Sequence, residues 1–94
     1  MIYPNNISHL IIGKGKTDKD GNIWFATEGA GLFFYNPVTQ EQKLFPIKKP
    51  YGKENYNINI IKSIKIDGNT IYCSTHYGTV YTFDIAKETF TLLH

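Results

Sequence analysis

The chain has 94 residues, enough for one small domain that buries only about 60–65% of its unfolded surface. Its net charge is +2, and all ten basic residues are lysines. Because arginine supplies the bidentate contacts to guanine and phosphate, this composition argues against a protein that reads nucleic-acid sequence, and we expect no nucleic-acid partner. The single cysteine, Cys73, excludes an internal disulfide and a metal site made only of cysteines.

Short apolar runs of alternating character predict β-strands, and the 15% share of aromatic residues suits strands better than helices. A first group of strands is expected at residues 7–12, 22–27, 32–35 and 42–45. Asp20-Gly21 predicts a tight hairpin between the first two, since glycine adopts a positive φ at little cost. Asn36 predicts an Asx-type turn into the fourth strand.

A second group of strands is expected at residues 60–64, 70–74, 79–83 and 89–93. Asp67-Gly68 and Asp84 take the places of the first hairpin and the first Asx turn. Residues 46–57 are rich in lysine, proline, glycine and tyrosine, and we expect them to link the two groups. The predicted fold class is therefore all-β, with two four-stranded antiparallel sheets.

The two groups are copies of one unit. Residues 20–36 return as residues 67–84 with one inserted residue, so that Ile71 follows Ile23 at a spacing of 48 residues. This period is in the range of β-propeller blades. We predict a single propeller-type domain over residues 1–94, with blade 1 at 5–46, a linking loop at 47–56 and blade 2 at 57–94. Two blades are fewer than a closed propeller contains, so the chain is expected to be a propeller fragment.

The repeat also predicts which residues share a role. Trp24 matches Tyr72, and both are expected to occupy equivalent buried places in successive blades. Glu28 matches His76 at the end of a strand. We expect Glu28, His76 and the adjacent Tyr77 to project from loop ends and to contribute to a ligand-binding surface, with Tyr51 and Tyr56 as further candidates for its rim.

Three other patterns have structural explanations. The oxygen ligands of residues 18–22 resemble a calcium loop, but a hairpin turn accounts for them and the bidentate glutamate of an EF-hand does not follow. Cys73 and His76 are three apart on a strand, so their side chains point to opposite faces and make poor co-ligands. The Gly-Lys-Gly-Lys run at 13–16 lacks the spacing of a phosphate loop. We expect no metal, no cofactor and no catalytic residue.

The run Asp20-Gly21-Asn22-Ile23-Trp24-Phe25-Ala26-Thr27, followed by Gly31-Leu32-Phe33-Phe34-Tyr35-Asn36-Pro37, closely resembles the two-component regulator propeller repeat. The second copy departs from the pattern, with Tyr72 for tryptophan and Thr79-Val80 for Gly-Leu. In that family many such repeats close into propellers that form the periplasmic sensor region of hybrid histidine kinases. The resemblance implies a non-enzymatic sensor fragment for signal transduction, with a small glycan breakdown product as ligand and a periplasmic location.

The start of the chain does not resemble a secretion signal, which favours the cytoplasm if Met1 is the true start. A membrane would be involved only through segments of a larger protein. The alternative function is a structural or protein-interaction module that self-assembles through its blades, either with itself or with further blades. Its rationale is an uncovered apolar face expected on each outer sheet. An enzyme is the least favoured class, since hydrolysis needs a carboxylate pair and His76 replaces Glu28 in the second repeat.

Overall fold

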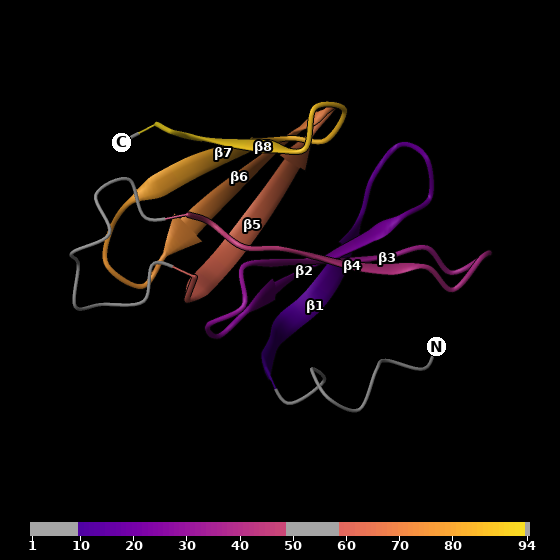
Figure 1. Cartoon of the computed structure of the whole chain (residues 1–94), viewed down its shortest axis with the longest axis horizontal. Helices are drawn as coiled ribbons and strands as arrows, with labels where there is room; N and C mark the ends of the chain where they lie inside the picture. Colours follow the sequence, from indigo (N-terminus) through magenta and orange to yellow (C-terminus); the bar gives the residue numbers. More distant parts are fainter. Residues whose placement is uncertain (1–9, 49–58, 94) are drawn as a thin grey trace.

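The computed structural model describes residues 10–48 and 59–93, which form two antiparallel four-stranded sheets and no helix (Figure 1). Each sheet is a meander, with order β1-β2-β3-β4 in the first and β5-β6-β7-β8 in the second. The strands are β1 Ile11–Thr17, β2 Ile23–Thr27, β3 Leu32–Tyr35, β4 Gln42–Phe45, β5 Ile61–Asp67, β6 Thr70–Thr75, β7 Val80–Asp84 and β8 Thr89–Leu92. The predicted all-β class with two sheets is confirmed, while the sheets do not close into a ring.

The first strand is where the sequence-based expectation is wrong. We expected residues 7–12, but β1 runs through the Gly-Lys-Gly-Lys segment to Thr17. A bulge between Ile12 and Lys16 breaks the register with β2 and absorbs this segment. Glycine is needed at position 15 because a Cβ there would come within 2.7 Å of Phe25 Cε1. The Gly-Lys-Gly-Lys run, which superficially resembles a phosphate loop, is therefore part of a bulged strand that packs on an aromatic ring.

The turn before the fourth strand has the same hydrogen bonds in both sheets. Asn36 Oδ1 accepts from the backbone N–H groups two and three residues later at 2.9 and 3.2 Å, and Asp84 Oδ1 does the same at 3.0 and 3.1 Å. Each turn ends on a residue with positive φ, Gln40 in one and Glu88 in the other. The two predicted Asx turns are therefore confirmed, and the second places Glu88 immediately before the start of β8.

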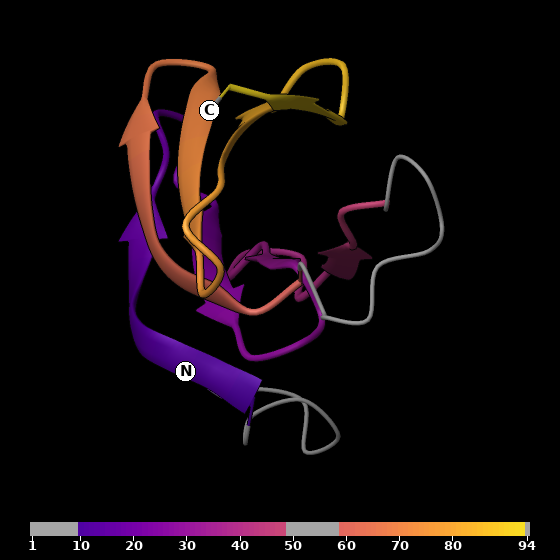
Figure 2. The same cartoon turned by 90° about the vertical axis from the view of Figure 1, so that its left-hand side faces the viewer.

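The two sheets share one apolar core. The face of β2 that carries Trp24 and Ala26 packs against the face of β6 and β7 that carries Ile71, Cys73 and Phe83. The ring of Trp24 is tilted against that of Phe83, with an interplanar angle of 57° and ring centroids 5.4 Å apart. The sheets touch where β1 and β2 of the first contact β5 of the second. From these contacts the two sheets diverge toward β4 and β8 (Figure 2).

Tyr72 corrects the expectation that both aromatics of the repeat are buried. Trp24 is 2% exposed but Tyr72 is 37% exposed, although each occupies the matching register position in its sheet. The reason is the direction of stacking. The Trp24 face of the first sheet meets the second sheet, whereas the Tyr72 face of the second sheet is its outer side.

The outer faces also differ from the uncovered apolar faces that we expected, because one is polar and the aromatic residues of the other are buried. On the second sheet the neighbours of Tyr72 across the strands are Lys65 and Thr82, and the next partner outward is Thr91. This face is polar. On the first sheet Phe25, Phe33 and Tyr35 form a separate cluster of buried aromatic residues. A polar outer face such as that of the second sheet is typical of a terminal repeat in stacked architectures.

Candidate binding groove between the outer strands

A groove of about 530 Å³ lies where the sheets have fanned apart, between β4 with the residues after it and β8. The lining is mostly apolar and comes from both sheets: Phe45, Pro46, Ile47 and Lys48 from the first, and Tyr81, Glu88, Thr89, Phe90 and Leu92 from the second. Sites for small molecules are typically concave and mainly apolar with few polar groups, and their volumes are about 300–1,000 Å³. The groove has the size and composition of such a site.

The floor of the groove is continuous with the core. Phe45 and Phe90 each pack against Phe83, with centroids 5.0 and 4.7 Å apart. Phe45 also packs against Trp24 at 5.7 Å. Because interior packing fixes these rings from behind, the groove presents aromatic surface without first having to rearrange. Trp24 is the only tryptophan and lies one ring away from the groove, so its fluorescence can report on occupancy.

One wall is held in place by Asn59. Its side-chain Oδ1 accepts a hydrogen bond from the backbone N–H of Ile47, and its Nδ2 donates to the carbonyl of Ile47 at 3.0 Å. Its own carbonyl accepts from Gly29 and Gly31 at 3.0 and 3.2 Å. The residue just before the second sheet thus ties the segment after β4 to the β2–β3 loop. Ile47 is buried as a result, and Lys48 follows at the mouth of the groove.

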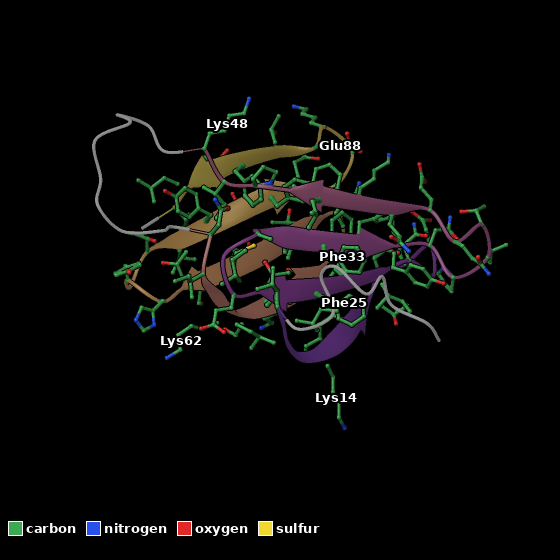
Figure 3. The ribbon with its side chains drawn as sticks, turned by 60° about the horizontal axis from the view of Figure 1, so that its bottom comes forward. Lys14, Phe25, Phe33, Lys48, Lys62 and Glu88 are labelled. Atoms are coloured by element: carbon green, nitrogen blue, oxygen red, sulfur yellow. The ribbon has the colours of Figure 1, made fainter. Side chains whose placement is uncertain are left out.

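The ends of the groove differ in charge. At one end Glu88 Oε2 lies 3.7 Å from Lys43 Nζ, which lies 3.7 Å from Glu41 Oε2 as well. This cluster of three carries one net negative charge. Lys48 lies at the other end, well separated from Glu88 (Figure 3). The groove is therefore an apolar channel with a negative and a positive end.

Glu28, His76 and Tyr77, the predicted ligand-binding residues, lie elsewhere and do not line this groove. All three are exposed, and His76 and Tyr77 form an edge-on ring pair with centroids 5.0 Å apart. Glu28 forms a β-bridge with Ile60, and the N–H of His76 donates to the carbonyl of Ile60 at 2.8 Å. The structure thus brings the matching ends of β2 and β6 to the two sides of one residue. Tyr51 and Tyr56 lie outside the described residues.

Residues 18–22, which resemble a calcium loop, form a hairpin turn. The carboxylate of Asp18 is buried and accepts three hydrogen bonds, from the backbone N–H groups of Asp20 and Asn22 and from the indole Nε1 of Trp24. Within residues 10–48 and 59–93, the structure holds no group of three or more histidine, cysteine, aspartate or glutamate side chains arranged to bind a metal.

Cys73 and His76 occupy different environments, as their spacing predicts. Cys73 is fully buried in the core between the sheets, where desolvation raises the pKa of its thiol to about 12. At neutral pH it is a protonated, inert side chain, because the thiolate is the reactive form. His76 is exposed at the loop end.

The groove was not predicted from the sequence. Its lining residues are ordinary strand aromatics and aliphatics, and one of them, Glu88, belongs to a turn. The only signal in the sequence was the repeat itself: stacked units that diverge outward leave a groove between their fourth strands. Phe45 and Leu92, each the last residue of its fourth strand, both line the groove.

Comparison of the chain with models of known protein families gives no match, and neither does comparison with curated proteins. In the part of the chain that the structure describes, no helix has the length and apolarity required to cross a membrane.

Proposed function

We propose that the chain is a non-enzymatic ligand-binding module built from two propeller-type blades, with the groove between β4 and β8 as its binding site. The observation that carries this proposal is the groove itself, about 530 Å³ of mainly aromatic and aliphatic lining on a packed base. The resemblance to the two-component regulator propeller repeat supports a sensor role within a larger regulator, with a periplasmic location.

The physical basis of binding is burial of an apolar ligand body. Covering apolar surface contributes about 25 cal/mol per Å², so one aromatic ring inserted between Phe45 and Phe90 stabilises the complex by a few kcal/mol before the costs of association. The core behind those rings holds them in place. Most of the ordering cost is therefore met on folding, and the ligand does not have to supply it.

A neutral apolar dye tests the site. N-phenyl-1-naphthylamine is titrated against the full chain, with dye emission and Trp24 emission as readouts. Leu92→Glu places a charge in the groove, and we expect it to weaken binding at least about tenfold. Leu44→Glu is the matched control, because Leu44 is similarly exposed (48% against 54% for Leu92) but does not line the groove. Equal binding by both variants, or no binding by the unaltered chain, would overturn the proposal.

A second candidate surface is the loop end with Glu28, His76 and Tyr77. Its support is the exposed ring pair beside a carboxylate, joined through Ile60. A sugar ring can stack on an aromatic side chain while a carboxylate accepts its hydroxyl protons, and the family resemblance implies a glycan fragment as ligand. NMR titration with oligosaccharides should shift resonances of these residues and not those of Phe90. His76→Ala and Tyr77→Ala should then abolish the shifts; shifts that persist in both variants contradict the assignment.

The alternative is a structural or interaction module that assembles through its blades or with further blades. The polar outer face around Tyr72 argues against stacking there, so the groove edge with exposed Leu92 is the better candidate contact. Sedimentation at micromolar concentration distinguishes the two functions. Association that Leu92→Glu abolishes and Leu44→Glu preserves supports assembly through the groove; a monomer at every concentration excludes it.

A further inference from the structure

The charged residues at the two ends of the groove favour one orientation of a charged ligand. Glu88 already has a cationic partner, Lys43, at 3.7 Å, and this end keeps one net negative charge through Glu41. An anionic group is repelled from that end. Lys48, at the opposite end, is the only cationic side chain among the described residues that line the groove.

The residue before Lys48 anchors the chain beside the groove. This residue, Ile47, is buried and has both backbone groups bonded to the side chain of Asn59. Because this anchor holds the chain at the mouth, the ammonium group can reach only a limited region at the end of the apolar channel. A partner charge in that region borders the apolar lining of the groove, where less water screens the charges and their interaction is stronger than in bulk solvent.

We propose that the natural ligand of the groove is an amphipathic anion: an apolar body between Phe45 and Phe90, and one carboxylate-type head group paired with Lys48. This inference rests on the proposed function and specifies its ligand class. The body supplies most of the affinity through burial, while the ion pair fixes the orientation and selects against neutral analogues. The negative end near Glu88 adds selection by repelling a reversed ligand.

Two probes that share an apolar body but differ in the anionic group test the inference. They are 8-anilino-1-naphthalenesulfonate, which is anionic, and N-phenyl-1-naphthylamine, which is neutral. We expect Lys48→Met to raise the dissociation constant of the anionic dye about 5- to 10-fold, as expected for a partly desolvated ion pair, and to leave the neutral dye unchanged. The affinity of the anionic dye should also fall with added salt in the unaltered chain and much less in Lys48→Met.

Lys62→Met is the matched control, because Lys62 is an exposed lysine on β5 that does not line the groove (Figure 3). It should change neither dye. Dodecanoate and dodecanol extend the test from sulfonate to carboxylate. Dodecanoate should displace the neutral dye at a lower concentration than dodecanol, and Lys48→Met should remove the difference.

The outcomes separate the two proposals. If neither dye binds the unaltered chain, the binding function fails together with this inference. If the neutral dye binds but Lys48→Met leaves the anionic dye unaffected, or weakens both dyes equally, the groove binds ligands and the anion preference is wrong. If Lys62→Met weakens the anionic dye as much as Lys48→Met, the attraction is a general charge effect and the assignment to Lys48 fails.

Discussion

The indole Nε1 of Trp24 donates a hydrogen bond to Asp18 Oδ2 at 2.8 Å, and the other oxygen of that carboxylate closes the β1–β2 turn. One buried carboxylate thus connects a surface hairpin to the core between the sheets. In the second repeat this hydrogen bond is absent, because Tyr72 stands in the place of Trp24 and has no indole N–H. The hydrogen bond between Trp24 and Asp18 therefore occurs on the face that packs against another sheet. The outer face of the second sheet lacks it.

Asp18→Asn should lower the free energy of unfolding by about 1–3 kcal/mol, since an amide cannot accept from all three donors and leaves a buried N–H without a partner. Urea unfolding monitored by circular dichroism measures the loss. Trp24→Phe removes the same indole hydrogen bond. If the bond is the cause, the double variant D18N/W24F should lose less than the sum of the two single changes. Strict additivity would contradict this account.

Trp24→Ala should cost about 3–5 kcal/mol, as expected for truncation of a large core aromatic. Tyr72→Ala, at the matching position of the second repeat, should cost about 1 kcal/mol or less because the side chain faces outward. Thermal and urea unfolding of both variants give the comparison. Similar losses at the two positions would show that Tyr72 is covered in solution.

Gly31→Ala should destabilise the chain more than Gly78→Ala. Both glycines have a φ of +85°, so both substitutions carry the strain of a left-handed conformation, about 1–2 kcal/mol. A Cβ at Gly78 meets open space, but one at Gly31 would collide with the carbonyl oxygen of Phe45 and lie 2.8 Å from Pro46 Cα. The excess loss at Gly31, about 1–3 kcal/mol in urea unfolding, measures that close packing. Equal losses would mean that the segment after β4 moves aside freely.

Burial of Cys73 makes stability depend on pH in the alkaline range. Its pKa is about 12 in the folded chain against an ordinary value of 9.0, so the unfolded chain loses the proton first as the pH rises. The contribution is fully present below pH 9 and is lost as the pH rises toward 12. Between about pH 7.5 and about pH 10.5, the stability difference between the unaltered chain and Cys73→Ala should shrink by about 2 kcal/mol. A constant difference would show that the thiol reaches solvent.

Most of the strand plan could be predicted from the sequence because its signals are local. The alternation around Trp24 and Ile71, glycine in the hairpins, and the Asx side chains at Asn36 and Asp84 act within a few residues, and the structure has a strand or a turn at each of these places. β1 was misplaced because glycine in a bulged strand has the same composition as glycine in a loop. The contact of Gly15 with the side chains of Ile23 and Phe25 on the next strand distinguishes the two.

Which face of each sheet is buried, and where the groove lies, was decided by tertiary structure. Trp24 and Tyr72 have the same local pattern, and their different exposure follows from the direction in which the sheets stack. The groove exists because sheets that contact along β1, β2 and β5 diverge toward β4 and β8. It combines Phe45 with Phe90 and Lys48 with Glu88, which come from the two halves of the chain. Sequence periodicity describes each strand separately, whereas a site between two sheets depends on their angle and contact.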